Sequence, residues 1–587
     1  MKPFPPLADR PGPSRRRSAW IDIAIAGAAP GVLLGALVAG LLFFLNPHLP
    51  FTVWTVARAI GLYGLILGSL SLAIHLPFVW NDRRRARRAV PWGLSAILGV
   101  MAIYDWSHAS YYAFYLPQGI NDRLTKAGVW LAAAGLISFY TALLHTLHRR
   151  SYGPRSRLLF LALTVAAIYA QLERREAFRP RVAPEPRPAT VEAARRPRLV
   201  MVGLESATLD AVLPLAEQGR LDFLSRCVRG GAYGRLGTLT PTRRPALWTT
   251  LATGKLPFKH AILGPRRYGA PFLGKDLELW LLPRGLAFQS WGTFGADSVP
   301  IDATHKQARS LWDVLAELGV AAGVVGWPVT SPPPPRLDFA LSDRFFSGEA
   351  AEGNAYPPDV AARAAAERVA PERLDPAVRR GLGRRPGSGV IRAAAGDQWR
   401  EAVILRLAAE RPETEALFVD LPGPQNIVRR YYGGYAAVHL EGQHDEVFER
   451  AAQVVEAYYT HLDGFLGALV RQAGPGALVA VVSAFGVDGP SKWQKARGLT
   501  PQAQLPGDFD RGADGVLLLY GEGVRPGVLL PRARVADVAP TLLYAMGLPV
   551  ARDLDGRALT EAFTPEFLAA HPLNFVPSYE TLSGATP

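Results

Sequence analysis

The sequence predicts two parts of different fold class: an all-α bundle of transmembrane helices, followed by an α/β domain whose mostly parallel sheet is covered by helices. Three observations lead to this prediction. Five long apolar segments lie before residue 173, and short apolar strands alternate with helical segments after residue 198. Residues 1–198 contain 25 Lys and Arg against 9 Asp and Glu, whereas the rest of the chain contains 40 against 41. Basic residues that flank apolar segments are typical of membrane topology, so we expect the membrane as a partner and no nucleic acid.

The first four apolar segments are long enough to cross a hydrocarbon layer of about 30 Å at about 1.5 Å per residue. The fifth is shorter, so whether it spans is left open. The first segment is too long for a cleaved signal peptide, and more apolar segments follow it. The five segments are Ala24–Leu45, Ala59–Val79, Val90–Tyr115, Ala127–Leu147 and Leu158–Leu172.

The arginines predict the orientation of this bundle. The N-terminus and the connections Arg83–Arg88 and Arg149–Arg157 are basic, whereas Asn46–Pro50 and Pro117–Lys126 are nearly neutral. The positive-inside rule therefore places the N-terminus in the cytoplasm. If the fifth segment spans, the chain is a multi-pass protein of the inner (cytoplasmic) membrane with a periplasmic C-terminal domain. The Arg-rich stretch that follows this segment argues the other way.

We expect four parts along the chain. Residues 1–23 form a basic cytoplasmic N-terminus, residues 24–172 a transmembrane bundle of about five helices, residues 173–197 a Pro/Arg-rich linker and residues 198–587 the soluble domain. Prolines at positions 180, 184, 186, 188 and 197 make the linker semi-rigid and extended.

Asp105 and His108 lie one helical turn apart in the third apolar segment. Ionisable groups inside a membrane are functional candidates, as a relay or a contact to a lipid headgroup. The interpretation we favour is that the span ends near Tyr104. Both groups would then lie in the interface, among aromatic residues.

Strands and helices alternate in the soluble domain, which predicts a mostly parallel sheet with helices on both faces. The site of such a fold lies at the carboxyl ends of the strands, here at Glu205, Trp327, Asp420 and Ser483–Gly486. The expected strands are Leu199–Leu204, Ala321–Trp327, Ala416–Leu421, Leu478–Ser483 and Val516–Tyr520, and the expected helices are Leu221–Val228, Ser310–Leu318 and Asp537–Met546.

At these positions the sequence resembles the alkaline phosphatase superfamily, and within it the type I phosphodiesterase/nucleotide pyrophosphatase group, which is related in fold to the sulfatases. The resemblance implies an alkaline-phosphatase-like fold. It also implies two zinc-type ions, held by carboxylates and imidazoles, that activate a Ser/Thr nucleophile. The segments that carry it are Leu199–Asp210, Leu247–Ile262, Gly323–Pro333, Ser342–Phe345, Ala416–Leu421, Leu478–Pro490 and Val535–Leu559.

Most of the functional positions that the resemblance implies are changed. The first aspartate ligand is Glu205, followed by Ser206 in place of the usual glycine, and the nucleophile position holds Arg244, which has no hydroxyl. Asp420 keeps a ligand aspartate. The ligand positions expected to be lost are Pro424 (or Gln425 with a one-residue slip), Ala484 and Phe485 of the serine-aspartate-histidine-glycine turn, and a last histidine on or near Arg511. We therefore expect no cofactor, and two Zn or Mn ions only if the site has been rebuilt.

The replacements suggest a hypothesis. Buried Glu205 and Asp420 need positive charge once the metals are absent, and Arg244 and Arg511 can supply it as ion pairs. The pocket is then either closed by internal ion pairs or open to an anion such as phosphate, sulfate or a lipid headgroup. Arg243, at an expected helix N-terminus, favours the anion slightly. Alternatively, Arg243 and Arg244 are merely solvated.

Other candidate residues are weaker. Thr242 could act as a displaced nucleophile, but no group near it would activate it. His260 and Cys227 are expected to be structural. Three further histidines have acidic neighbours and could form a new metal site, although solvated helices explain them better: His439, His444 and His461.

The sequence thus leaves two main hypotheses. The first is a membrane-anchored, catalytically inactive member of the superfamily that acts as an extracytoplasmic binding or scaffolding domain. The second is a metal-dependent hydrolase or transferase of phosphoesters or sulfate esters with a rebuilt site. A transport role for the bundle ranks last, because only Asp105 and His108 suggest it.

Overall fold

The computed structural model describes residues 13–81, 83–173, 196–284, 297–347, 353–491, 495–496, 500–508, 512–531 and 533–580. The chain forms two compact units. The first contains Met1–Pro180 and Arg266–Pro300, and the second contains Arg181–Pro265 and Ile301–Pro587. Most of the expected linker, residues 174–195, and the start of the expected N-terminal segment, residues 1–12, lie outside the described residues.

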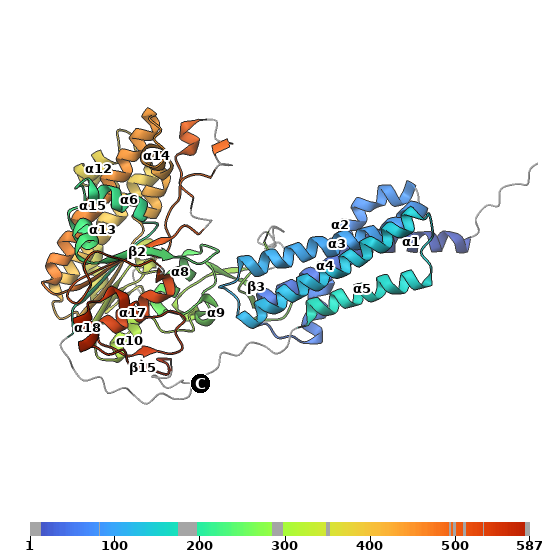
Figure 1. Cartoon of the computed structure of the whole chain (residues 1–587), viewed down its shortest axis with the longest axis horizontal. Coiled ribbons are helices and arrows are strands. Elements are labelled where there is room, and N and C mark those ends of the chain that lie inside the picture. The colour runs from blue at the N-terminus through green and yellow to red at the C-terminus, as the bar shows by residue number, and fades with distance from the viewer. Residues whose placement is uncertain are drawn as a thin grey trace, which may run out of the picture. The chain divides into compact units, whose positions relative to one another are not determined.

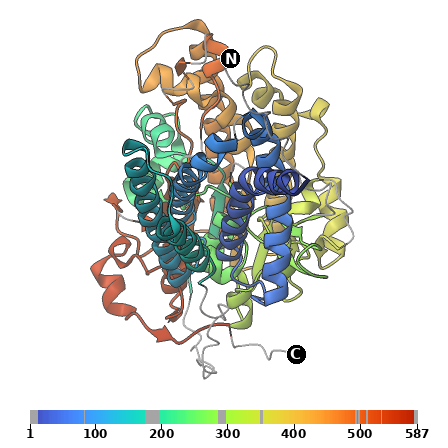
Figure 2. The ribbon, with the colours of Figure 1, turned by 90° about the vertical axis from the view of Figure 1, so that its right-hand side faces the viewer.

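Unit 1 contains five helices that lie side by side in both ribbon views (Figures 1 and 2). Each has a stretch that is long and apolar enough to cross a membrane, the fifth included. Helix α1 begins ahead of Ala24 because residues from Pro13 onward continue the helix beyond the apolar stretch. The helices are α1 (Pro13–Leu45), α2 (Val53–Asn81), α3 (Arg83–Tyr111), α4 (Gln118–Leu147) and α5 (Pro154–Leu172).

Helices α1 and α2 approach each other closely at glycines. A Cβ atom added to Gly31 would lie 2.1 Å from the carbonyl oxygen of Leu67, and one added to Gly35 would lie 2.5 Å from the amide nitrogen of Gly64. No side chain fits at either position. This spacing of small residues is the usual means by which apolar helices pack without a polar contact.

The interpretation that the third span ends near Tyr104 needs correction, because α3 continues to Tyr111 and buries both polar groups. The Nε2 amide of Gln171 in α5 donates to Oδ1 of Asp105 at 3.1 Å. Nε2 of His108 accepts the backbone N–H of Arg284 at 2.9 Å, and its Nδ1 donates to the carbonyl of Tyr104 at 2.8 Å. Both side chains are therefore buried inside unit 1, where they bond to α5 and to Arg284.

The segment Arg266–Pro300, which we call the insert, is the part of unit 1 that the sequence did not separate. It forms a small antiparallel sheet in the order β4-β3-β5, where β3 is Arg266–Gly269, β4 is Glu278–Leu279 and β5 is Ser298–Pro300. Asn46, at the end of α1, bonds to Leu281 of this segment. The insert therefore packs against the bundle at the end where α1 and α3 finish.

Unit 2 is built on a ten-stranded sheet whose order is β12-β2-β11-β10-β1-β9-β6-β7-β8, with β13 paired to β2. The central strands β10, β1, β9, β6 and β7 are parallel, whereas β11 is antiparallel to both of its neighbours. The bounds are β1 Leu199–Leu204, β2 Ala232–Gly237, β6 Ala322–Val325, β7 Phe339–Leu341, β8 Ala355–Tyr356, β9 Ala416–Leu421, β10 Leu478–Ser483, β11 Gly515–Tyr520, β12 Val528–Leu529 and β13 Ala533–Arg534. The predicted α/β fold class is confirmed, because this sheet carries helices on two faces (Figure 1).

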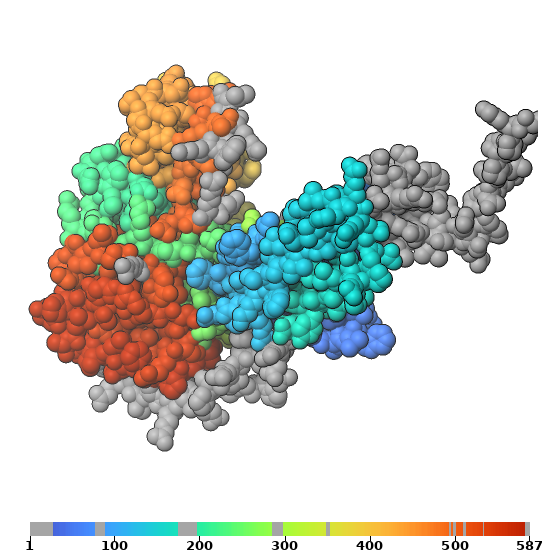
Figure 3. Space-filling view, turned by 45° about the vertical axis from the view of Figure 1, so that its right-hand side comes forward, coloured from blue at the N-terminus to red at the C-terminus, as the bar shows by residue number. Residues whose placement is uncertain are grey.

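Two groups of helices cover the sheet, one on each side in Figure 1. The first group is α6 Leu209–Glu217, α7 Asp222–Gly230, α11 Asp359–Ala366, α12 Pro376–Gly381, α13 Ser388–Glu410, α14 Arg429–His439 and α15 Glu446–Ala473. The second is α8 Arg244–Thr253, α9 Pro257–His260, α10 Leu311–Glu317, α17 Val538–Ala545 and α18 Pro565–Ala570. Every residue of β1, β9 and β10 is buried, as strands covered on both faces require. The residues after β11, drawn red, form a continuous part of the surface in Figure 3 and include a small pair of strands, β14 Val550–Ala551 and β15 Phe575–Val576.

Candidate functional site

The carboxyl ends of β1 and β9 meet at the centre of the sheet. Their register places Gly203 opposite Asp420, and Glu205, one residue beyond β1, donates its backbone N–H to the carbonyl of Leu421. Glu205 and Asp420 are therefore neighbours, and both are buried. In a parallel sheet this edge is where loops and helix N-termini converge.

Arg244 lies across these two carboxylates. It is the first residue of α8, where the preceding residues Thr238–Arg243 bring the chain back over the end of the sheet. Its Nε donates to Oε1 of Glu205, and its Nη2 donates to Oδ2 of Asp420 at 3.1 Å. The Arg244 side chain is 36% exposed, whereas those of Glu205 and Asp420 are 1% and 0% exposed. The guanidinium thus covers two buried acids from the solvent side.

The electrostatics of this cluster favour a tightly held arginine. Burial lowers the pKa of Arg244, but the charges of Glu205 and Asp420 raise it further, so that the net pKa lies above its usual value. Burial, and next the neighbouring charge of Glu205, hold the pKa of Asp420 well above its usual value against the opposing effect of Arg244. Glu205 and Asp420 thus share the single positive charge of Arg244.

A second arginine stands behind the first and was missed by the sequence reasoning. Arg400 of α13 is only 14% exposed, and its Nη1 lies 4.0 Å from Oδ1 of Asp397. Tyr458 of α15 donates its hydroxyl to Oδ2 of Asp397 at 2.6 Å. Burial is the largest cause that raises the pKa of Asp397 to about 7. A Cβ atom at Gly423 would lie 1.8 Å from Oδ2 of Asp397, so only glycine fits there.

Asp343, just after β7, also faces Arg244. Burial raises the pKa of this carboxyl, and the charge of Arg244 opposes the rise. Val329 donates its backbone N–H to Oδ2 of Asp343 at 3.4 Å, while no described residue bonds to Oδ1. The cluster therefore contains four acids, Glu205, Asp343, Asp397 and Asp420, around two guanidinium groups.

The sequence profile described as "Type I phosphodiesterase / nucleotide pyrophosphatase" matches residues 199–538, which is more than half of the chain. The chain belongs to this family. The predicted resemblance is thereby confirmed, and no curated protein matches the chain.

Solved structures of the same superfamily are similar to this chain at low identity. Wild-type alkaline phosphatase PafA is 13% identical, with a TM-score of 0.41, and the match covers 63% of this chain and 100% of that one. Murine ectonucleotide pyrophosphatase / phosphodiesterase 5 is 12% identical, with a TM-score of 0.37, and the match covers 62% and 100%. A 2-O GAG sulfatase is 12% identical, with a TM-score of 0.38, and the match covers 63% and 74%.

The positions where the family resemblance implies further metal ligands hold no suitable donor. Pro424 opens a π-helical turn, Pro424–Val428, and Gln425 beside it accepts the hydroxyl of Ser206. Ser206 has a φ of 61°, a left-handed conformation that suits the glycine usual at this position. Ala484 and Phe485 are buried and apolar.

Two metal ions do not fit this donor set. Their oxygen ligands would be those of Glu205 and Asp420, which the guanidinium of Arg244 already binds. In the part of the chain that the structure describes, no group of three or more His, Cys, Asp or Glu is arranged to hold a metal ion. A binuclear site needs four to six such ligands at fixed distances.

Of the other predicted anion-binding residues, Arg243 is described and bonds elsewhere. Arg243 points the other way, and its Nη1 donates to the carbonyl of Leu263 at 2.9 Å. Arg511 lies outside the described residues. Thr242, the candidate displaced nucleophile, has a buried hydroxyl without a hydrogen-bond partner among the described residues and no histidine bonded to it. Of the three arginines named from the sequence, only Arg244 is seen on the carboxylates.

The histidines occupy structural positions. Burial lowers the pKa of His260 to about 3, and its ring bonds to Thr250 Oγ1 at 3.0 Å and to the amide of Ile262 at 3.2 Å. The remaining three pair with single glutamates, at 2.7 Å for His439–Glu456, 2.9 Å for His461–Glu401 and 3.5 Å for His444–Glu449. One carboxylate for each imidazole fits an ion pair and not a metal centre.

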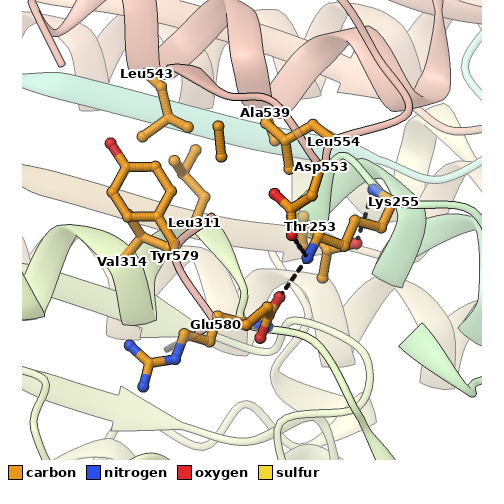
Figure 4. A pocket seen from close by; sticks show the side chains of 13 residues that line it. Thr253, Lys255, Leu311, Val314, Ala539, Leu543, Asp553, Leu554, Tyr579 and Glu580 are labelled. Carbon is orange, nitrogen blue, oxygen red and sulfur yellow. Dashed lines mark hydrogen bonds and ion pairs between the residues drawn. The ribbon is translucent and has the colours of Figure 1, made fainter. Parts of the chain in front are cut away.

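A separate ionic cluster holds the turn after α8, as Figure 4 shows. Lys255, 8% exposed, donates from Nζ to Asp553 Oδ2 and to Glu580 Oε1, both at 2.7 Å. Ser578 donates to the same oxygen of Asp553. The cavity beside them has a volume of about 20 Å³, which is space for one water. The cluster is therefore a structural contact between these segments and not a ligand pocket.

Proposed function

We propose that this chain is a membrane-anchored, non-catalytic member of the type I phosphodiesterase family, whose α/β unit is an extracytoplasmic binding or scaffolding domain. The observation that carries the proposal is the guanidinium of Arg244 on Glu205 and Asp420. Arginine keeps its proton in proteins and therefore cannot attack phosphorus. It also supplies the positive charge that two metal ions would otherwise bring to these acids.

The geometry favours closed ion pairs over capture of an anion. Two hydrogen-bonding nitrogens of Arg244 are already bound to carboxylates, and acids outnumber arginines in the cluster. A phosphate, sulfate or lipid headgroup would meet four carboxyl groups within the site. We therefore expect a partner that recognises the surface of the domain, and no small anion in the cleft.

Measurements on the full-length protein in detergent test this function. We expect no stoichiometric zinc or manganese in the purified chain and no hydrolysis of bis-p-nitrophenyl phosphate above the buffer rate, with or without added metal. Two tightly held transition metals, or hydrolysis abolished by a chelator, would overturn the proposal in favour of a rebuilt hydrolase or transferase.

The proposed orientation has its own support. The connections 82 and 148–153 adjoin basic sequence, and the insert bonds to the opposite end of the bundle, through Asn46, His108 and Tyr112. Gln171 bonds to Asp105, so the end of α5 also lies at that end. Together with the positive-inside rule, this arrangement supports the proposal that unit 2 lies outside the cytoplasm.

Two variants that each add one exposed cysteine test the orientation. Cys227 is buried and its thiol pKa is raised by burial, so it should not react with a membrane-impermeant maleimide. In intact spheroplasts we expect labelling of exposed Arg385→Cys in unit 2 and labelling of Ser151→Cys, between α4 and α5, only after permeabilisation. The reverse pattern would place unit 2 in the cytoplasm.

A further inference from the structure

Asn46 at the end of α1 binds the insert as a neighbouring strand would. It is fully buried, its Nδ2 donates to the carbonyl of Leu281 at 2.8 Å, and its Oδ1 accepts the backbone N–H groups of Trp280 at 2.7 Å and Leu281 at 3.0 Å. Three hydrogen bonds from one buried side chain satisfy backbone groups that would otherwise be unpaired, which is costly to lose.

Further contacts extend this clasp, by which we mean the bonds between the bundle and residues 273–284. His48 bonds to the carbonyl of Glu278 at 2.8 Å and stacks on Trp280 with ring centroids 3.8 Å apart. The bundle's other bonds also reach backbone atoms: His108 to the N–H of Arg284 at 2.9 Å, Arg58 to the carbonyl of Leu273 at 3.2 Å and Tyr112 to the carbonyl of Leu282 at 3.4 Å. Tyr104 also donates its hydroxyl to the carbonyl of Arg284, so among the described residues six side chains of the bundle bond to the insert.

The segments of unit 2 that precede and follow the insert are each bonded by an arginine of unit 2. Arg243 donates to the carbonyl of Leu263, two residues before Pro265, and Arg344 donates to the carbonyl of Ile301 at 3.0 Å. Ile301 also donates its N–H to the carbonyl of Pro265 at 3.0 Å. This bond joins the two crossing segments, by which we mean the residues of unit 2 that directly precede and follow the insert.

Each of these arginines adjoins a residue of the acidic cluster. Arg243 precedes Arg244, and Arg344 follows Asp343, whose carboxylate faces Arg244. We therefore expect a shift of residues 263–265 or of Ile301 to displace the backbone that carries Arg244 or Asp343. The antiparallel pairing of β3 with β5 keeps the two crossings in register.

We propose that the insert couples the helical bundle to the Arg244 ion-pair cluster, so that an event at the clasp end of the bundle changes the stability of the closed Arg244 pair. The coupling is reciprocal by linkage, so loosening of the ion pair weakens the clasp equally. It requires no catalysis, and it would operate in an inactive or an active domain alike.

Hydrogen exchange of the full-length protein in lipid nanodiscs, followed by mass spectrometry, tests the coupling. Asn46→Ala removes three bonds to the insert, so we expect about tenfold faster exchange or more in residues 270–284, and also in residues 261–265 and 301–305 of unit 2. His48→Phe, which keeps the ring on Trp280 but loses the bond to Glu278, should give the same pattern more weakly. Asn121→Ala at the same end of the bundle is the matched control, because Oδ1 of Asn121 has no hydrogen-bond partner among the described residues.

The reciprocal variant is Arg344→Met, which leaves the clasp residues intact. We expect faster exchange in residues 270–284, and an effect of the double variant Asn46→Ala/Arg344→Met that is smaller than the sum of the two. Faster exchange confined to residues 270–284 in Asn46→Ala and His48→Phe, with additive effects in the double variant, would overturn the coupling. Metal content and hydrolysis are unaffected by that outcome, so it leaves the proposed function to its own test.

Discussion

Replacement of Lys255 by methionine is expected to lower the free energy of unfolding of unit 2 by about 2–3 kcal/mol. The Lys255 side chain is 8% exposed, and its ammonium binds both Asp553, just after β14, and Glu580, the last described residue of the chain. Removing one partner of a buried ion pair leaves the other charge without compensation. This expected loss is smaller than the about 3–5 kcal/mol that breaking a fully buried ion pair costs, because Asp553 and Glu580 are 29% and 30% exposed and water can reach them. Chemical denaturation of the full chain, followed by tryptophan fluorescence, measures it.

Arg557→Met is the control for this prediction. Arg557 pairs with Glu561 at 2.5 Å, but the two side chains are 52% and 38% exposed, so its loss should cost at most about 1 kcal/mol. The double variant Lys255→Met/Glu580→Gln should recover part of the lost stability, since it removes a carboxylate that has lost its partner. If Lys255→Met and Arg557→Met are equally stable, the buried cluster contributes nothing of its own.

The sheet could be predicted from the sequence where its strands are buried on both faces. The runs Leu199–Leu204, Ala416–Leu421 and Leu478–Ser483 are continuous apolar stretches, and the structure has strands with the same bounds. Strand β2 (AYGRLG) escaped prediction because glycines and an arginine interrupt its apolar pattern, although it pairs with β11 on one side and with β12 and β13 on the other. The apolar pattern of a sequence identifies strands by their burial, and a strand that is only partly buried, such as β2, has a weaker pattern.

The candidate site was predictable only where it lies at strand ends. The predicted Glu205, Asp420 and Arg244 are together because parallel strands finish at one edge and α8 begins over it. Arg400, Asp397 and Tyr458 come from the middle of long helices, where a buried charge looks the same in the sequence as a solvated one. The direction of Arg243 was equally unpredictable, because adjacent residues at a helix start point in different directions.

The packing of the insert against the bundle was likewise not predictable from the sequence. Residues 266–300 follow a stretch that resembles the family and have no apolar segment long enough to cross a membrane. Nothing in their pattern indicates that they pack with helices more than 150 positions earlier. The contacts run from side chains such as Asn46 and His108 to backbone atoms, which leave no signal in the sequence of the insert itself.

The largest effect is expected for Arg244→Met, which removes the guanidinium from two fully buried carboxylates. We expect the free energy of unfolding at neutral pH to fall by about 3 kcal/mol, near the lower limit for a broken buried pair, because Arg244 is 36% exposed and water can enter. Arg235→Met is the matched control. Arg235 pairs with Asp210 at 2.5 Å, but the side chains are 50% and 33% exposed, so its loss should cost at most about 1 kcal/mol.

The pH dependence separates lost charge compensation from lost packing. The pKa of Asp420 is raised on folding, so this group favours the folded state at low pH and its contribution is lost as the pH rises above its unfolded value of about 4. Without Arg244 the pKa of Asp420 should rise further. The stability difference between wild type and Arg244→Met should therefore grow from pH 4 to pH 8 and shrink toward zero below pH 4, where the carboxyl is protonated in both states. A difference that stays constant over this range would mean that Arg244 stabilises the fold by packing alone. It would contradict the proposal that the charge of Arg244 compensates Glu205 and Asp420 in place of metal ions.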